Sequence, residues 1–334
     1  MPAARVLAVR DLRVEYATGR GPVVAVDGIT LDVAAGEFVG VVGESGCGKS
    51  TMLFAIAQLL SPPAAITEGS VTFHGQNLVT MTNRQLRALR WRDYSVVMQS
   101  AMNALNPVTT IAAQFKDALD AHGTLSKRQI AERSVEVMKL VGIDPIHLRS
   151  YPHQLSGGMR QRAMIAMALL FTPDLVIMDE PTSALDVVAQ RSLMVQIKEL
   201  QQRLGFAVVF VTHDMSLVSH FSDRLLVMYA GQVVETGPTR IVFDTPAHPY
   251  SRGLLDAFPS IRGPRVTLTG IPGSPPDLMQ PPSGCRFHPR CPVAFSDCSQ
   301  VEPELYQVGA VQARCLLHAP DRSARPDLRE EVRS

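Results

Sequence analysis

The feature that most constrains the fold of this chain is the glycine-rich run at residues 43–51. It reads Gly-Glu-Ser-Gly-Cys-Gly-Lys-Ser-Thr and fits the P-loop pattern, with the two required glycines at Gly43 and Gly48. Residues 37–42 are mostly apolar, which favours a short buried strand, and residues 50–60 have the length and spacing of a helix. The sequence therefore predicts a strand, a phosphate-binding loop and a helix in that order.

The residue types in this loop suit the binding of nucleotide phosphates. Glycines let backbone N–H groups turn inward around a β-phosphate, Lys49 reaches the β- and γ-phosphates, and the Ser50 hydroxyl meets Mg²⁺. We interpret Cys47 as a small filler, because nothing in the sequence indicates a reactive thiol. The residues of the loop predicted to bind the nucleotide are Gly43, Ser45, Gly46, Cys47, Gly48, Lys49, Ser50 and Thr51.

A second apolar run, residues 175–178, ends in two carboxylates, Asp179 and Glu180. Neighbouring residues on a strand point to opposite sides, so the two cannot share one task unless the strand has already ended. We expect Asp179 to hold Mg²⁺ through its water shell. We expect Glu180 to orient and deprotonate the water that attacks the γ-phosphate.

Strand patterns alternate with helical patterns over most of the chain, which predicts an α/β fold with a mainly parallel sheet. Between residues 259 and 284, 11 of the 26 residues are Pro or Gly, which disfavours helix and central strand and indicates a linker. The expected organisation is a nucleotide-binding domain over residues 1–258 with a helical insertion at roughly 90–172, a linker over 259–284, a small cysteine-rich module over 285–320 and a polar tail over 321–334.

Charge and hydropathy give no sign of a nucleic-acid-binding surface, a lipid-binding surface or a membrane-spanning segment. The 32 basic and 31 acidic side chains leave a net charge of +1, so nothing favours broad attraction to nucleic acid or to anionic lipid. Apolar runs such as residues 163–171 are far shorter than the roughly 18–20 residues that span a bilayer. We expect a chain that stays in the cytosol and binds no nucleic acid.

A second anion-binding motif follows the P-loop. Residues 155–162 read LSGGMRQR and lie just before a helical run, where free backbone N–H groups and the helix dipole favour a phosphate. With this motif the chain resembles the ATP-binding cassette family over residues 6–255. Members of that family sandwich ATP between the P-loop of one subunit and the signature of the other. The resemblance implies that Ser156, Gly157 and Gly158 act in trans, so that a monomer hydrolyses ATP poorly.

The resemblance implies further site residues. Tyr16 would stack on adenine, and Gln99 would touch Mg²⁺ and report to a membrane partner. Asp186, in a loop that reads Ser-Ala-Leu-Asp, would lie where the chain crosses the dimer interface, and His213 would hydrogen-bond the γ-phosphate. The catalytic set is then Glu180, His213 and Gln99, and the Mg²⁺ set is Ser50, Gln99 and Asp179.

Four strings narrow the resemblance to the ATPase subunits of bacterial dipeptide and oligopeptide importers, which include nickel-uptake relatives. They are QSAMNALNPV at 99–108, YPHQ at 151–154, SGGMRQRAMIAMA at 156–168 and AHPYSRGLL at 247–255. This implies a peripheral subunit on the cytoplasmic face of the membrane. Its partners would be a second ATPase subunit in a heterodimer, two membrane-spanning permease subunits and an extracytoplasmic substrate-binding protein. Import of nickel or another small solute, and a soluble cassette that acts on DNA or ribosomes, are the alternatives.

Four of the five cysteines crowd into the C-terminal part of the chain: Cys285, Cys291, Cys298 and Cys315. Their spacing alone leaves zinc, an iron–sulfur cluster or no metal open, because four thiolates suit a tetrahedral Zn²⁺ as well as a 4Fe–4S cluster. Residues 284–292, GCRFHPRCP, look like the C-terminal region of the same importer ATPases, some of which hold a 4Fe–4S cluster. The resemblance therefore favours the 4Fe–4S cluster.

Overall fold

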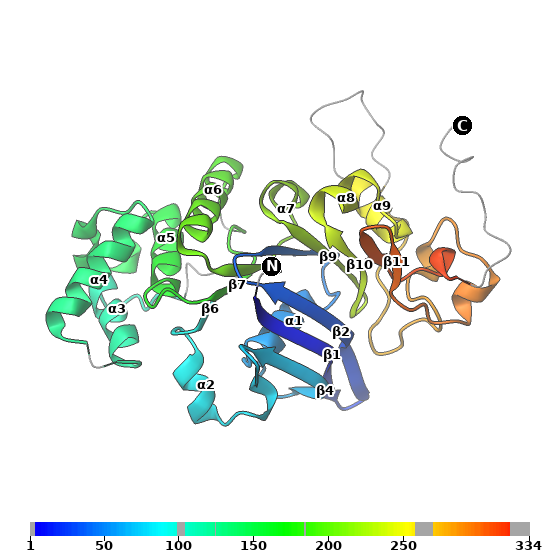
Figure 1. Cartoon of the computed structure of the whole chain (residues 1–334), viewed down its shortest axis with the longest axis horizontal. Coiled ribbons are helices and arrows are strands. Elements are labelled where there is room, and N and C mark those ends of the chain that lie inside the picture. The colour runs from blue at the N-terminus through cyan, green and yellow to red at the C-terminus, as the bar shows by residue number, and fades with distance from the viewer. Residues whose placement is uncertain (1–3, 99–103, 124, 184, 258–269, 321–334) are drawn as a thin grey trace.

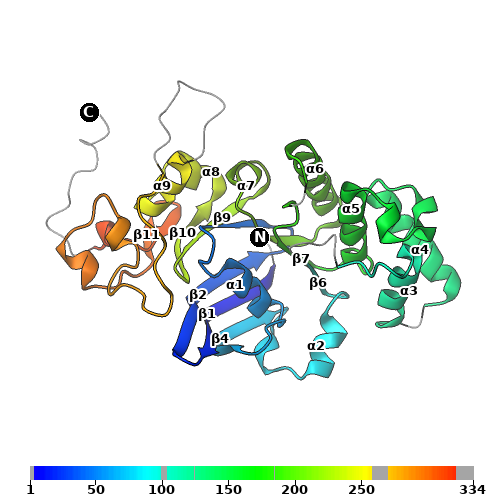
Figure 2. The same cartoon turned by 180° about the vertical axis from the view of Figure 1, so that it is seen from behind.

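The structure is a computed structural model that describes residues 4–98, 104–123, 125–183, 185–257 and 270–320. Two β-sheets form its centre, with a helical region at one end and the C-terminal residues at the other (Figure 1). The view from behind shows α1, which spans Lys49–Ile56, beside the N-terminal strands (Figure 2).

The larger sheet has eight strands among the described residues, and its central part is parallel. β3 pairs in parallel with β8 and β9, and β7 pairs in parallel with β8 and β6. The predicted α/β fold is confirmed, although β10, β11 and β12 add antiparallel pairs at one edge. In spatial order the strands are β11 (Tyr306–Val308), β12 (Val311–Ala313), β10 (Gln232–Pro238), β9 (Arg224–Tyr229), β3 (Phe38–Val42), β8 (Ala207–Val211), β7 (Leu175–Asp179) and β6 (Tyr94–Val97).

A second sheet of four antiparallel strands was not predicted from the sequence. Its spatial order is β2 (Gly21–Ala34), β1 (Arg5–Thr18), β4 (Ala64–Phe73) and β5 (Gln76–Asn77). The alternating apolar residues of β1 indicate a half-buried strand, but the same pattern fits pairing in either sheet. Only the contacts with β2 and β4 separate this layer from the parallel sheet.

The central strands of the larger sheet are buried on both faces. In β8, Val208 and Phe210 face one apolar core, whereas Val209 and Val211 face the other. The first core lies under the helices, and the second lies between the larger sheet, the smaller sheet and α1. Strands covered on both sides read as continuous apolar runs, which is why residues 207–211 show no alternation.

The helical region at one end contains α3 (Ile111–Asp120), α4 (Lys127–Leu140) and α5 (Gly157–Ala168). Local signals start these helices, since the side chain of Thr110 caps α3 and Ser126 forms a capping box with Gln129 on α4. β6 belongs to the larger sheet although it lies inside the range expected to be helical. The other helices are α2 (Asn83–Leu89), α6 (Val187–Leu204), α7 (Met215–Phe221), α8 (Thr239–Asp244) and α9 (Pro249–Asp256).

The C-terminal residues contact the larger sheet. Residues 270–284 contain no helix or strand, but β12 then pairs with β10, which places Ala313 opposite Glu235. The backbone N–H of Arg314 also donates to the carbonyl of Val234. Residues beyond the predicted linker therefore extend the sheet of the nucleotide-binding part. No helix within the described ranges is long and apolar enough to cross a membrane.

Candidate functional site

A cavity of about 600 Å³ lies at the ends of the parallel strands, against the glycine-rich loop. The loop between β3 and α1 forms its floor, and residues that follow β7 and β8 reach it from the side. Among the described residues the lining consists of Tyr16, Val23, Ala25, Gly43, Ser45, Gly46, Gly48, Lys49, Ser50, Thr51, Glu180, His213 and Leu278. A cavity of this size and position in an open α/β sheet suits a nucleotide.

The glycine-rich loop is held in shape by its own lysine. Lys49 is 8% exposed, and its ammonium donates to the carbonyls of Gly43 at 2.8 Å and Glu44 at 2.9 Å. Gly43 has a φ of 152°, and a Cβ there would lie 2.2 Å from the carbonyl oxygen of Met228. Only glycine fits at position 43. Its backbone conformation gives the loop the shape that can surround an anion.

Asp179 ends β7 and faces the start of α1. Its carboxylate is 1% exposed and accepts a hydrogen bond of 3.0 Å from the Ser50 hydroxyl. Burial raises the pKa of the Asp179 carboxyl, and the neighbouring Glu180 adds to the increase. A buried carboxylate beside a hydroxyl is a hard oxygen donor pair of the kind that Mg²⁺ prefers, so these two residues fit the metal.

The backbone turns out of strand β7 at Glu180. Its φ is 44°, and its backbone N–H donates to the carbonyl of Val211 at 2.9 Å. The strand has therefore ended at Glu180, which allows its side chain and that of Asp179 to serve the same cavity. The Nδ1 atom of His213 lies 3.2 Å from Oε1 of Glu180, and both residues line the cavity.

Tyr16 lines the same cavity next to the start of α1. Its hydroxyl is 3.1 Å from Oγ1 of Thr51, and its ring shares the wall with Val23 and Ala25. The ring is thus available for stacking on a flat base, while the phosphate-binding groups lie on the floor.

Comparison with known proteins agrees with this geometry. Residues 26–183 match the ABC transporter family, and residues 234–298 match the oligopeptide/dipeptide transporter C-terminal region. The chain is 40% identical over 320 residues to the dipeptide transport ATP-binding protein DppD of Caldanaerobacter subterraneus, covering 95% of this chain and 98% of that protein. It is 42% identical to the oligopeptide transport ATP-binding protein OppD of Salmonella typhimurium, covering 93% and 94%.

The chain belongs to the ATP-binding cassette family, in the branch with an oligopeptide/dipeptide transporter C-terminal region. It is therefore an ATPase of the ABC type, with ATP and Mg²⁺ as its nucleotide and metal. A solved dimer of an ATP-binding cassette in a post-hydrolysis state, bound to ADP and Pi, superposes with a TM-score of 0.63 at 29% identity, covering 70% of this chain and 99% of that one.

Some predicted site residues of the cassette lie away from the cavity. The Cys47 side chain is buried beneath the loop, where burial raises its thiol pKa, and it is absent from the cavity lining. Ser156 caps α5 by accepting from the N–H of Met159, and Asp186 caps α6 by accepting from the N–H of Ala189. Gln99 lies outside the described residues.

The signature residues border a different cavity of about 210 Å³. Ser156, Gly158 and Met159 line it together with Leu185, which precedes Asp186 in the same loop. A single copy of the cassette therefore does not bring the signature to its own phosphate-binding loop. The arrangement is the one expected if the signature acts on the nucleotide of a partner subunit.

The four C-terminal cysteines line one small cavity of about 10 Å³ together with His248 and His288. Burial raises the pKa of the Cys285 thiol, of Cys291 to about 11 and of Cys315 to about 12, so these thiols are neutral at pH 7 in the metal-free chain. No group of three or more His, Cys, Asp or Glu in the described ranges is arranged to hold a metal ion.

Arg290, which no sequence motif predicted as a site residue, binds the phosphate-binding loop through Glu44. Arg290 Nη1 donates to Glu44 Oε2 at 2.6 Å, and Nη2 donates to Oε1 at 3.0 Å. The Tyr250 hydroxyl accepts from the backbone N–H of Glu44 at 2.9 Å. Arg290 precedes Cys291 in the string GCRFHPRCP, which predicts a role for the cysteines but none for the arginine. Nothing local in the sequence marks Glu44 as the partner of Arg290.

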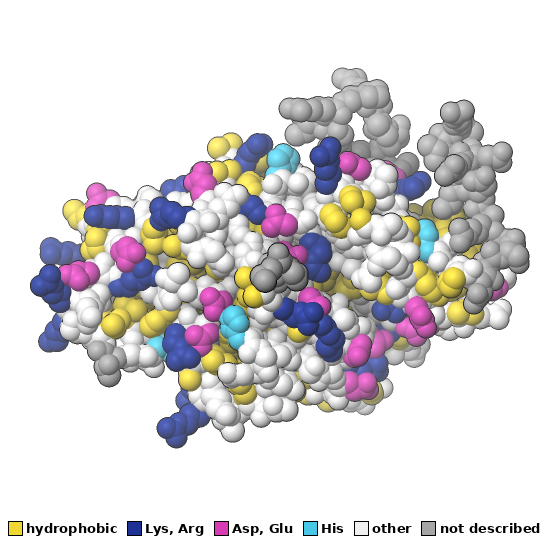
Figure 3. All heavy atoms as spheres, viewed as in Figure 1, with side chains coloured by type: hydrophobic (Ala, Val, Ile, Leu, Met, Phe, Trp, Pro, Cys, Tyr) yellow, Lys and Arg dark blue, Asp and Glu magenta, His cyan; other side chains and the backbone are white. Residues whose placement is uncertain are grey.

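Surface charge agrees with the sequence composition. On the face shown in Figure 3, basic and acidic side chains are interspersed rather than gathered into a patch of one sign. That face therefore offers no broad basic surface for the phosphate backbone of a nucleic acid.

Replacing Asp179 with Asn should raise the melting temperature of the nucleotide-free protein at pH 7. The folded state raises the pKa of Asp179 by burial, so ionised Asp179 opposes folding above the ordinary pKa of an aspartate. The gain should vanish at pH values below that pKa, where the carboxyl is neutral in both states. Thermal unfolding between pH 3 and pH 8 measures this.

Asp244→Asn is the matched control, because that carboxylate is 66% exposed and should leave the melting temperature unchanged. A melting temperature of Asp179→Asn at pH 7 below that of the wild type would contradict the electrostatic account of the site.

Proposed function

We propose that this cassette hydrolyses ATP to energise the uptake of dipeptides or oligopeptides across the cytoplasmic membrane. The observation that carries the proposal is the match of residues 234–298 to the oligopeptide/dipeptide transporter C-terminal region, alongside a cavity lined by the phosphate-binding loop, Tyr16, Glu180 and His213. The relatives named above are ATP-binding proteins of dipeptide and oligopeptide transport. They favour peptides over nickel, and a transporter over a soluble cassette.

Each residue of the site has a task that its position supports. Lys49 and the loop N–H groups hold the phosphates, and Tyr16 stacks on the base. Ser50 and Asp179 hold Mg²⁺, which neutralises charge on the β- and γ-phosphates when bound. Glu180 lies beside the γ-phosphate end of the cavity, where its carboxylate accepts a proton from the attacking water. The family resemblance assigns a further Mg²⁺ contact to Gln99, which lies outside the described residues.

His213 orients Glu180 and the γ-phosphate. Its Nδ1 atom lies 3.2 Å from the Glu180 carboxylate, and the side chain is 68% exposed, so the other ring nitrogen can face the phosphate. A histidine placed between the base and the transferred group can align both during hydrolysis.

The assembly has a second, similar ATPase subunit, two membrane-spanning permease subunits and an extracytoplasmic substrate-binding protein. Support for the second ATPase comes from the placement of Ser156, Gly157 and Gly158 at the N-terminus of α5, away from the nucleotide cavity of the same chain. Asp186 lies in the loop that crosses the interface, and the variant LSGGMRQR indicates a heterodimer. This chain then lies on the cytoplasmic face of the membrane as a peripheral subunit.

We also propose that the chain is divided into a nucleotide-binding domain, a linker, a cysteine-rich part and a tail. Residues 1–258 bind and hydrolyse ATP and include the helical subdomain at roughly 90–172, and residues 259–284 link this part to the cysteine-rich residues 285–320. The polar tail over residues 321–334 lies outside the described part of the chain.

We also propose that the cysteine-rich residues hold a 4Fe–4S cluster. Supporting it, the four thiols come from separate short loops and converge on one cavity, which is a soft donor set of the right number. Binding of the cluster would require the cysteines to bind as thiolates, so it would be accompanied by the release of protons. The cluster would staple these loops to the sheet without any redox step in ATP hydrolysis.

Replacing Glu180 with Gln should lower ATP hydrolysis by roughly 10²–10⁴-fold, because the amide cannot accept the proton of the attacking water. Binding of ATP should persist, since Lys49 and Tyr16 are unchanged. Phosphate release and nucleotide binding by the purified cassette with its ATPase partner measure the two effects.

Glu199→Gln on the exposed side of α6 is the control and should leave hydrolysis unchanged. If Glu180→Gln hydrolyses ATP at the wild-type rate, Glu180 is not the base and the assignment of the catalytic set fails.

Anaerobically purified protein should contain about four iron and four sulfide per chain, with broad visible absorption that a Cys298→Ser substitution removes. Elemental analysis and visible spectra measure this. One zinc per chain would replace the cluster with a tetrahedral zinc site, and a metal-free protein with four free thiols would contradict any metal at this position.

A further inference from the structure

One residue of the nucleotide cavity comes from far along the chain. Leu278 lines the cavity with the phosphate-binding loop and with Tyr16, Val23 and Ala25, although it belongs to the segment over residues 270–284 that follows α9. Neither the cassette motifs nor the cysteine pattern accounts for it. Its side chain is half-buried and packs against the core beneath the helices.

A short turn presents this leucine. The Asp277 side chain accepts from the N–H of Met279 at 2.9 Å, and the Asp277 carbonyl accepts from the N–H of Gln280 at 3.1 Å. An aspartate that binds the backbone two residues on stabilises such a turn without help from a helix or strand. Leu278 is therefore held at the tip of an ordered turn.

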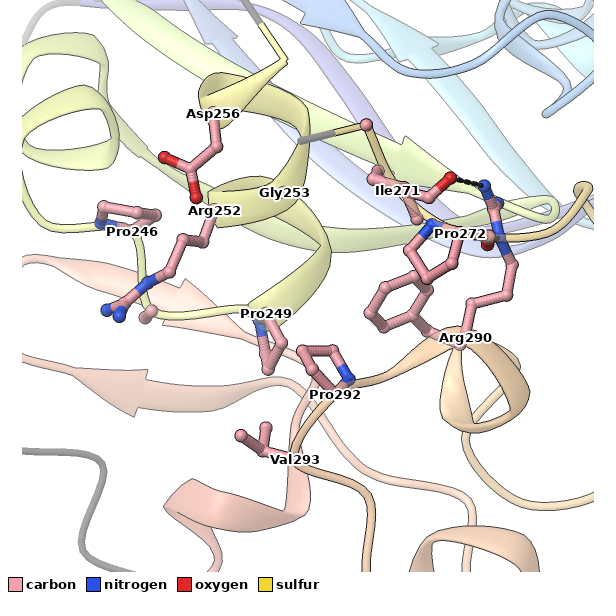
Figure 4. A pocket seen from close by; sticks show the side chains of 13 residues that line it. Pro246, Pro249, Arg252, Gly253, Asp256, Ile271, Pro272, Arg290, Pro292 and Val293 are labelled. Carbon is pink, nitrogen blue, oxygen red and sulfur yellow. Dashed lines mark hydrogen bonds between the residues drawn. The ribbon is translucent and has the colours of Figure 1, made fainter. Parts of the chain in front are cut away.

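Arg290 fixes the same segment against the phosphate-binding loop. Its Nε donates to the carbonyl of Pro272 at 2.8 Å, and Nη2 lies 3.4 Å from the carbonyls of Ile271 and Gly273. Figure 4 shows the guanidinium beside Ile271 and Pro272. The same guanidinium holds Glu44 in a two-point ion pair, and its side chain is 6% exposed. One buried arginine thus ties the segment to the loop that binds phosphate.

The chemistry of the cavity indicates which part of a nucleotide meets Leu278. The polar lining consists of the loop amides, Lys49, the hydroxyls, Glu180 and His213, which suit phosphates, Mg²⁺ and water. The apolar lining consists of Tyr16, Val23, Ala25 and Leu278. An isobutyl group has no donor for a phosphate, whereas it packs well on a purine face or on the carbons of a ribose.

We propose that Leu278 is a nucleotide-binding residue that packs against the nucleoside, and that Arg290 is the positioning residue that holds it there. The C-terminal region specific to this branch thereby becomes part of the ATP site of its own chain. The inference rests on the proposed function of the cavity as an ATP site. The inference adds a contact between Leu278 and the nucleoside, and it leaves the hydrolysis reaction unchanged.

The test compares two ligands that differ by the nucleoside. Titration calorimetry of the full chain with Mg²⁺ and ADP, and with Mg²⁺ and pyrophosphate, separates contacts to adenosine from contacts to phosphate. Leu278→Ala should weaken ADP binding by about fivefold, because part of an apolar contact is lost, and should leave pyrophosphate binding unchanged. Leu278→Met should bind ADP within about twofold of the wild type, since the methionine restores the apolar contact.

Met279→Ala is the matched control on the same turn, because Met279 does not line the cavity. Arg290→Lys should weaken ADP binding, and adding Leu278→Ala to it should cost less than the same change in the wild type if Arg290 acts through Leu278. Additive effects would overturn the positioning role of Arg290.

Equal ADP affinity of Leu278→Ala and the wild type would overturn the inference, as would equal weakening of ADP and pyrophosphate. Neither result would contradict the assignment of the cavity as an ATP site. A wild-type chain that binds neither ADP nor pyrophosphate would instead contradict the proposed function, and the two failures are therefore distinguishable.

Discussion

Parallel pairing of β3, β8 and β7 is the constraint on which the ATP site depends. Val41 pairs with Val211, and Val211 pairs with Asp179, so the three strands end at one edge of the sheet. Residues that follow each strand by one or two positions then meet, which brings Gly43, Glu180 and His213 to one cavity. The strands are buried on both faces, and a slip by one residue would exchange side chains of different size, such as Val209 and Phe210, between the two packed cores.

The C-terminal region is built into that site rather than attached to it. β12 extends the larger sheet beside β10, and Arg290 joins the phosphate-binding loop through Glu44. The buried ion pair is satisfied on both sides, since the arginine also donates to backbone carbonyls. Cys291 is thus the neighbour in sequence of a side chain that contacts the phosphate-binding loop.

Local signals predicted much of this structure. The P-loop pattern and the carboxylates after an apolar run each depend on residues close together in the sequence, and the structure places the loop between β3 and α1 and the carboxylates at the end of β7. Long-range pairing could not be predicted in this way. The period of β1 does not say which strand lies beside it, and nothing near Leu278 or Arg290 marks their proximity to residues more than two hundred positions earlier. Composition predicted a small cysteine-rich module at residues 285–320, but it could not predict that β12 within that range pairs with β10.

Uptake of a labelled dipeptide by the organism that carries this protein tests the central claim most directly. Cells with a chromosomal Glu180→Gln substitution are compared with wild-type cells, with unlabelled oligopeptide and nickel as competitors, in a strain that lacks other peptide importers. The account predicts that the substitution abolishes uptake and that oligopeptide competes while nickel does not. Dipeptide uptake at the wild-type rate in the substituted strain would contradict it.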